Sequence, residues 1–242
     1  MRALTVSEII RLRETASRHH PVDRALAILQ TVMPDHSRDQ LAALALGQRD
    51  ALLLSVRRNT FGNMLPGTSE CPGCSGTVEF ELDCAEIQGR GAEPHPERLS
   101  LDGYEVDIRP LNSFDLAAAL GAGTTAESRA VLLARCVTNA RFGDQAVAPG
   151  GLPAAVEKGI SESVLAADAQ AETLLELSCP ECGHNWQNAL DIVYVLWLEI
   201  SARAQRLLME VHMLARAYGW REKDVFALSP ERRAAYLRMV VA

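Results

Sequence analysis

The sequence has little of what a membrane protein or a nucleic-acid-binding protein needs. Its longest uninterrupted apolar stretch, Ile192 to Leu198, is far shorter than the ~18 residues of a membrane span. The first residues contain no charged segment followed by an apolar run, so no secretory signal is expected. Lys and Arg number 24 against 31 Asp and Glu, a net charge of −7. Because affinity for phosphate depends on clustered basic residues, this balance argues against a nucleic-acid partner.

The recognisable catalytic motifs are also missing. The sequence contains no Gly-x-Gly-x-x-Gly, no phosphate loop ending in Lys-Ser/Thr, no Gly-x-Ser-x-Gly and no His-Glu-x-x-His. His19 and His20 are adjacent and would face different ways on a helix, and His212 is expected to pack or cap. We therefore predict that the protein is not an enzyme and has no small-molecule substrate.

Two short cysteine pairs are the most informative feature that is present. They are Cys71-Pro72-Gly73-Cys74 and Cys179-Pro180-Glu181-Cys182. Two intervening residues let one tight turn present both thiolates to a single ion, and four thiolates complete the tetrahedral shell that Zn²⁺ prefers in closed structural sites. Without a secretory signal, such pairs indicate metal ligands in a reducing compartment. We predict that Cys71, Cys74, Cys179 and Cys182 bind one structural Zn²⁺.

Other roles for the cysteines stay open at this stage. The four could be unpaired buried thiols, two disulfides or redox pairs, although a redox Cys-x-x-Cys normally follows a βαβ strand and opens a helix. Here strands are predicted beside both pairs. His184 could replace a cysteine as ligand, but it is expected to lie outside the ligand shell or face solvent. Cys84 and Cys136 lack a partner at ligand spacing, and Cys136 is expected in mid-helix as a small buried hydrophobe.

Periodicity places helices at both ends of the chain and strands near the cysteines. The helices are expected before Pro21, over 21–33, over 37–56 with a break at Gly47, over 113–120, 125–139, 153–171 and 191–218, and after Ser229. The strands are expected over 77–83, 104–110, 173–177 and 185–190, and the loops over 62–67, 89–97 and 144–151.

These elements predict an α+β fold with helical N- and C-terminal parts around a small β-rich zinc ribbon. The 104 residues from Ser75 to Ser178 separate the two pairs, against ~15–20 in a compact ribbon. We therefore predict a ribbon that carries an α/β insert. The expected parts are an N-terminal helical region (1–66), a split ribbon (67–83 and 172–190), the insert (84–171) and a C-terminal helical region (191–242).

The C-terminal part carries a family resemblance. Its specific segments are Cys179-Pro180-Glu181-Cys182-Gly183-His184-Asn185-Trp186, Leu196-Trp197-Leu198-Glu199-Ile200, Ala217-Tyr218-Gly219-Trp220 and Leu228-Ser229-Pro230-Glu231-Arg232-Arg233. With these, the chain resembles the baseplate proteins of contractile phage tails, named for the T-even phage hub-assembly protein and found also in prophages and phage-tail-like injection systems. The resemblance extends over the whole chain. Family members need not share the cysteines, so the zinc module would mark a subgroup.

The resemblance implies a non-enzymatic component or assembly factor of a contractile-tail or injection-system baseplate or hub. Its partners would be other baseplate, hub or tail proteins. It would be found in the bacterial cytoplasm during assembly or in the baseplate of the finished particle. The alternatives are a zinc-ribbon interaction module of another complex and, less favoured, a thiol-redox protein.

Four aromatic residues on or near the last long helix are candidate interface residues. Tyr194, Trp197, Tyr218 and Trp220 exceed what one helix face needs for packing, and aromatic residues are enriched at interface anchors. The alternative is that they pack the core.

Overall fold

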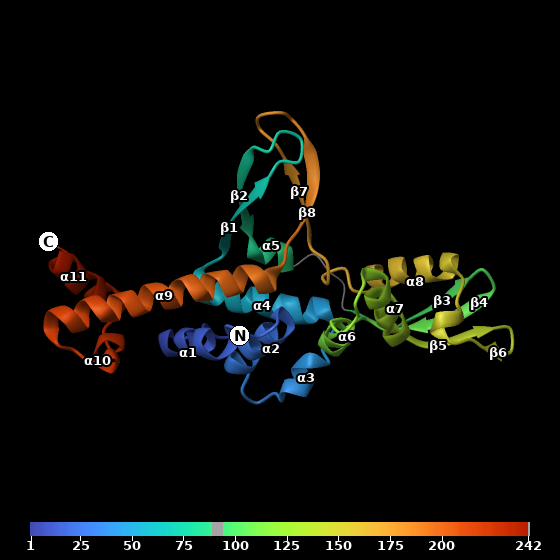
Figure 1. The fold of residues 1–242 in the computed structure, drawn as a ribbon, viewed down its shortest axis with the longest axis horizontal. Coiled ribbons are helices and arrows are strands. Elements are labelled where there is room, and N and C mark those ends of the chain that lie inside the picture. The colour runs from blue at the N-terminus through green and yellow to red at the C-terminus, as the bar shows by residue number, and fades with distance from the viewer. Residues whose placement is uncertain (89–93, 242) are drawn as a thin grey trace.

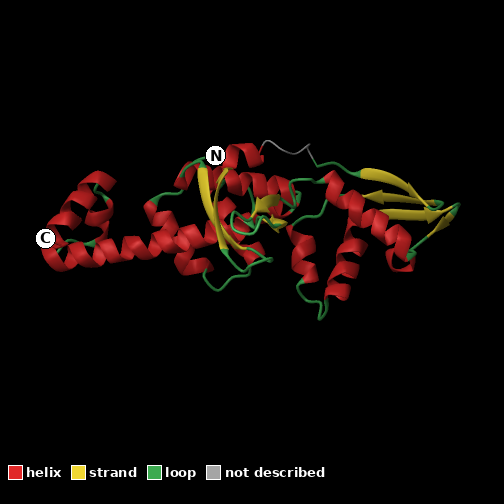
Figure 2. Cartoon of the chain, turned by 90° about the horizontal axis from the view of Figure 1, so that it is seen from above, coloured by secondary structure: helices red, strands yellow, loops and turns green. Residues whose placement is uncertain are grey.

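The computed structural model describes residues 1–88 and 94–241. Figure 1 shows an elongated molecule in which a helical body lies along the long axis. Two β-hairpins project together from one side of the body, the α/β insert lies at one end, and the C-terminal helices lie at the other. Figure 2, viewed from above, shows the same separation of the sheet of the insert from the helical body.

The helical body packs the N-terminal helices against one long C-terminal helix. Its elements are α1 (Val6–Ala16), α2 (Pro21–Val32), α3 (Arg38–Ala42), α4 (Leu46–Phe61) and α9 (Ile192–Tyr218). Local sequence starts these helices: Thr5 and Glu8 form a reciprocal capping box at α1, and Ser37 caps α3. The apolar faces meet in one core that includes the fully buried Leu196 and Ile200 of α9.

Two antiparallel hairpins form the projecting part, which we call the tower. The first hairpin pairs β1 (Met64–Glu70) with β2 (Thr77–Asp83), and the second pairs β7 (Leu174–Ser178) with β8 (Asn185–Ala189). The short α5 (Cys84–Gln88) follows β2. The hairpins are separate two-stranded sheets, and isolated two-stranded hairpins are at best marginally stable.

The insert has a sheet and a hydrophobic core of its own. Its elements are β3 (Glu97–Leu101), β4 (Tyr104–Ile108), α6 (Ser113–Ala119), α7 (Thr125–Cys136), β5 (Val137–Phe142), β6 (Gln145–Ala146), a 3₁₀ turn (Pro149–Gly151) and α8 (Ala154–Ala167). The four strands pair antiparallel in sequence order, and Val156 and Ile160 of α8 pack in the core beneath them. The buried Asp115 accepts hydrogen bonds from Arg109 and Arg135, which ties α6 to the sheet and to α7.

The C-terminal end of α9 extends beyond the body and carries two further helices. Gly219 ends α9 in the left-handed conformation (φ 68°), after which α10 (Glu222–Phe226) and α11 (Pro230–Val241) fold back. The buried Arg233 of α11 contacts Glu210 of α9 at 2.6 Å.

The α+β class and most predicted elements agree with the structure, but several details were wrong. The break in the predicted 37–56 helix lies at residues 43–45, because Ala45 forms a β-bridge with Asn112. The helix predicted over 125–139 ends at Cys136, because the next residues pair with β4. Strands β1, β3, β5 and β6 and helices α5 and α10 were not predicted. Part of the loop expected over 89–97 lies outside the described residues.

Gly47, the expected break, is in fact a close contact between the helical body and the insert. Its backbone N–H donates to Oδ2 of Asp168 at 2.9 Å, at the C-terminal end of α8. A Cβ at this position would overlap Oδ1 of Asp168 and lie 2.8 Å from Cβ of Gln170 and 3.0 Å from the backbone N of Ala171. The close approach of these two parts therefore requires glycine.

Gly47→Ala is expected to destabilise the protein by roughly 1–3 kcal/mol, because overpacking outweighs the ~1 kcal/mol gain in helix propensity. Urea unfolding measures the change. Gly150→Ala is the matched control, since a Cβ there meets nothing within 4 Å, and surface changes of this kind stay within about 0.5 kcal/mol. A Gly47→Ala protein as stable as the wild type would contradict the close contact.

Candidate metal centre

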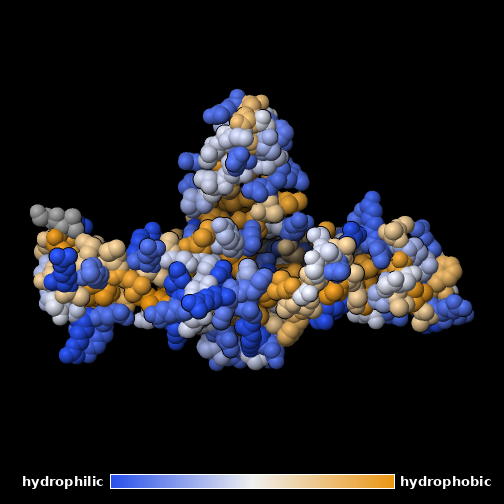
Figure 3. Space-filling view, viewed as in Figure 1, coloured by the Kyte–Doolittle hydropathy of each residue, from blue (hydrophilic) through white to orange (hydrophobic). Residues whose placement is uncertain are grey.

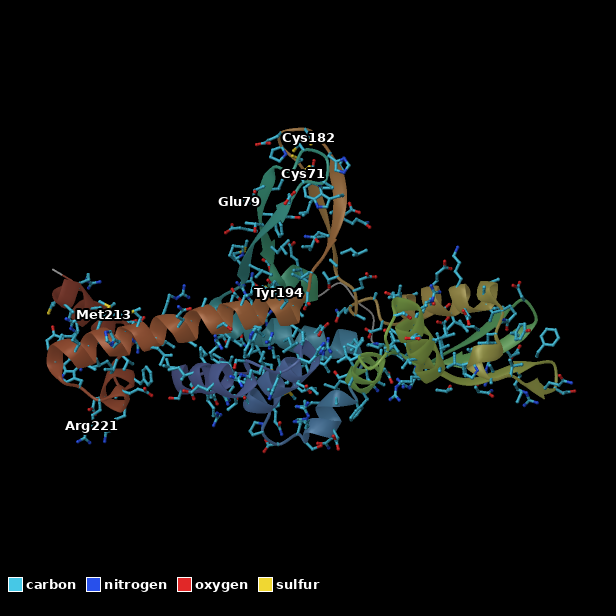
Figure 4. The ribbon with its side chains drawn as sticks, viewed as in Figure 1. Cys71, Glu79, Cys182, Tyr194, Met213 and Arg221 are labelled. Carbon is cyan, nitrogen blue, oxygen red and sulfur yellow. The ribbon has the colours of Figure 1, made fainter. Side chains whose placement is uncertain are left out.

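Each cysteine pair forms the turn at the tip of one hairpin, and Figure 4 shows Cys71 and Cys182 together at the top of the tower. The two turns have equivalent backbone hydrogen bonds. Cys71 N–H donates to Gly76 at 2.8 Å, and Cys179 N–H donates to His184 at 2.9 Å. Within the turns, Ser75 N–H donates back to Cys71 O at 2.8 Å, and the corresponding bond from Gly183 to Cys179 is 2.9 Å.

The residue after each pair adopts the left-handed conformation. Gly183, directly after Cys182, has φ 72°, and Ser75 occupies the same position in the first turn with φ 58°. This conformation directs the chain back into the second strand of each hairpin. Glycine adopts it readily, whereas serine does so at a cost.

The structure brings all four sulfurs together. Their Sγ atoms lie within 4.8 Å of one another, with Cys71 and Cys182 at 3.6 Å and Cys74 and Cys179 at 3.7 Å. Four sulfurs at the Zn–S distance of ~2.3 Å in a tetrahedron are separated by about 3.8 Å, whereas a disulfide requires ~2.05 Å. The spacing therefore fits a four-thiolate metal shell, and all four cysteines are free.

The sulfurs strongly influence one another's ionisation. The backbone N–H of Cys182, with a further N–H from Glu181, lowers the pKa of Cys179 to about 7. At Cys74 the backbone N–H of Gly76 favours the thiolate, but the neighbouring sulfurs and desolvation outweigh it and raise the pKa to about 12. Four such thiols ionise together only where a cation compensates their charge.

His184 borders the sulfur quartet, but its ring is not among the clustered ligand atoms. The ring stacks on Trp186 with a centroid separation of 6.2 Å and covers Gly73, where an added Cβ would lie 3.1 Å from the His184 ring. His184 thus packs one turn against the other.

The two remaining cysteines lie in hydrophobic cores away from the quartet. Cys136 is buried at the last residue of α7, where burial raises its pKa to about 11 and its thiol donates to Leu133 O at 3.3 Å. The prediction of a small buried hydrophobe fits this position, although mid-helix placement was wrong because α7 ends there. Cys84 is buried at the base of the first hairpin, 3.5 Å from Nη1 of Arg57.

The group that attaches the tower to the body was not predicted from the sequence. Arg57 of α4 is only 1% exposed. Its guanidinium contacts Glu199 of α9 through two hydrogen bonds of 3.0 and 2.8 Å and donates to the carbonyls of Gly62 and Met64, both at 2.8 Å. A single side chain thus connects α4, α9 and the start of β1. Its signal in the sequence was an arginine directly after the largely apolar segment from Leu52 to Val56.

The aromatic candidates do not form one surface. Trp197 is 6% exposed and packs in the helical core, with the guanidinium of Arg24 4.7 Å above its ring. Tyr194 is 58% exposed at the base of the tower. Tyr218 and Trp220 stack at 4.8 Å, and both lie against Tyr236 of α11. This cluster fastens α11 to the end of α9.

The chain matches a known protein family over most of its length. Residues 1–193 match the family described as T4 bacteriophage base plate protein. The chain belongs to this family. No curated protein and no solved structure matches the chain.

The matched region of this T4 base plate family protein includes the helices α1 to α4, the insert and both cysteine pairs. It ends at Val193, so most of the C-terminal run on which the resemblance was mainly based lies beyond it. Within the described ranges, none of the helices is both long and apolar enough to cross a membrane, the long α9 included.

Proposed function

We propose that this protein is a non-enzymatic structural or assembly component of a contractile-tail or injection-system baseplate or hub. In this proposal Cys71, Cys74, Cys179 and Cys182 hold one structural Zn²⁺. The family match supports the baseplate role, and the mutual approach of the four sulfurs to within 4.8 Å is the observation that supports the metal site.

A four-thiolate shell leaves no coordination position for a water or a substrate, so the metal would act on the fold alone. The tower has little apolar core near its tip, where, among the residues that the structure describes, Val78 and Trp186 alone pack around the buried Cys71 and Cys179. A bound ion would therefore hold the two hairpins together where packing cannot. A rigid tower of this kind suits a protein that must present fixed surfaces to neighbouring subunits.

Elemental analysis and particle association test the two halves of the proposal separately. The purified protein is expected to contain about one zinc per chain, and the protein should co-purify with tail or baseplate complexes of its phage or injection system. Zinc below about 0.2 per chain together with four titratable thiols would remove the metal site. Absence from every tail complex and assembly intermediate would remove the baseplate role.

A further inference from the structure

The base of the tower contains a groove that the proposed metal site does not explain. It has a volume of about 1160 Å³ and is lined by the inner parts of both hairpins and by the first turns of α9. Figure 3 shows hydrophobic side chains gathered at this level, where the tower meets the body. The groove is therefore bounded by the first hairpin and by a later segment that contains the second hairpin and the start of α9, which are about 90 residues apart in the sequence.

Apolar side chains in the groove are left open to solvent. Tyr194 and Leu198 of α9 line it and are 58% and 48% exposed, and Phe80 of β2 lines it above them. Phe80 also covers Gly67 on the opposite strand, so its ring is held in place by its partner strand. Clustered exposed apolar groups of this kind are typical of protein–protein contact sites.

The charges in the groove are of one sign. Among the described residues that line it are the carboxylates of Glu79, Glu81, Asp191 and Glu199, and no lysine or arginine. Two of the four are already engaged. Asp191 caps α9 by accepting from the backbone of Tyr194 at 2.9 Å, and Glu199 pairs with Arg57.

Glu79 and Glu81 are the unengaged pair. Both are exposed on β2, and neither side-chain carboxylate has a hydrogen bond or an ion pair with another residue in the described ranges. A ligand that brings positive charge would therefore meet two free carboxylates beside exposed apolar side chains. Phosphate-bearing partners such as nucleic acid or anionic lipid would be repelled.

We propose that this groove binds a protein segment of a neighbouring tail or baseplate subunit in which Lys or Arg alternates with apolar residues. The apolar side chains would cover Leu198 of α9, and the basic groups would pair with Glu79 and Glu81, whose side chains leave β2 on the face opposite to Phe80. Lys and Arg fit such a site because their apolar stems pack on hydrophobic surface while the charged ends reach a carboxylate. An arginine can also stack on the exposed ring of Tyr194. The identity of the partner as a tail protein rests on the proposed function, whereas its chemistry rests on the groove alone.

A synthetic peptide of alternating Lys and Leu, compared with one of alternating Glu and Leu, tests the chemistry independently of the baseplate role. Binding to the full-length, metal-loaded protein is measured by fluorescence anisotropy. The Lys-Leu peptide is expected to bind and the Glu-Leu peptide is not. Glu79→Gln with Glu81→Gln should weaken binding about tenfold, the effect of two ion pairs of ~0.7 kcal/mol each, and Leu198→Ser should weaken it as well.

Glu157→Gln with Glu162→Gln, on α8 of the insert and outside the lining of the groove, is the control and should change binding less than twofold. Equal binding by the Glu79/Glu81 variant and the wild type, with unchanged zinc content and circular dichroism, would overturn the inference. Equal affinity for both peptides would also overturn the inference. The same holds if light scattering gives the mass of a dimer in which a second copy of this chain fills the groove.

A second experiment identifies the natural segment. An array of overlapping peptides from the other tail proteins is probed with the full-length protein. Bound peptides are expected to combine basic and apolar residues and to be lost with the Glu79/Glu81 variant, whereas bound peptides without Lys or Arg would contradict the inference.

If the protein is found in tail complexes but the Glu79/Glu81 variant assembles normally, the groove proposal fails and the baseplate role survives. If binding of the Lys-Leu peptide depends on the groove but the protein never enters a tail complex, the baseplate role fails and the chemistry proposed for the groove survives.

Discussion

Replacing Cys182 by serine is expected to abolish stoichiometric zinc binding and to release the two hairpins from each other. Cys182 is exposed at the tip of the tower, so the substitution disturbs little packing, and its effect would come from the lost ligand. Structural zinc sites contribute roughly 10–16 kcal/mol of apparent binding free energy in peptides at neutral pH. The hairpins have little core of their own to replace that contribution.

Hydrogen exchange gives the most direct measurement of this effect. Backbone amides of β1, β2, β7 and β8 should lose protection in Cys182→Ser and after chelation of the wild type, whereas the core of α1, α4 and α9 should keep it. Cys136→Ala is the matched control, because it also removes a thiol but lies in the insert, and it should retain about one zinc per chain. Full zinc content in Cys182→Ser would contradict the four-thiolate site.

Arg57→Leu is expected to destabilise the protein by about 3 kcal/mol, the lower end of the ~3–5 kcal/mol cost of breaking a buried ion pair. The lower end applies because the Glu199 side chain is 24% exposed and retains some hydration. The substitution would leave Glu199 without its partner and the carbonyls of Gly62 and Met64 without their donor. The attachment of β1 to α4 and α9 should loosen.

Urea unfolding of Arg57→Leu measures this cost, with Arg98→Ala as control. Arg98 also pairs with a carboxylate, that of Asp107, but its side chain is 70% exposed, and exposed pairs contribute about 0–1 kcal/mol. The double variant Arg57→Leu, Glu199→Leu should recover part of the loss, because no uncompensated charge then remains. An Arg57→Leu protein within 0.5 kcal/mol of the wild type would show that the tower does not depend on this contact.

The metal-ligand candidates could be predicted because their signal is local. Two residues between cysteines determine how closely a turn can place their sulfurs, and a residue with left-handed freedom after the turn closes it, as Gly183 does. The caps of the first helices follow from the same kind of near-neighbour hydrogen bonding, seen at Thr5 with Glu8 and at Ser37. Such features require no knowledge of the rest of the chain.

The wrong predictions share a different cause. Strand β1 was taken as a Gly/Pro loop because Pro66 and Gly67 disfavour strands. Its pairing with β2 and the cover that Phe80 supplies over Gly67 outweigh that preference. The early end of α7 at Cys136 has the same origin, since pairing with β4 competes with helix propensity and prevails.

The sequence by itself determined the spacing within each cysteine pair, the helix caps, the acidic charge and the helical periodicity of α9, because these depend on residues within a few positions of one another. Only the tertiary structure decided that turns separated by 104 residues meet, that Arg57 joins the tower to the body, and that Glu79 and Glu81 share a groove with Tyr194. Contacts of this kind depend on how apolar faces of distant segments pack. That packing is a property of the folded chain as a whole and not of any local stretch.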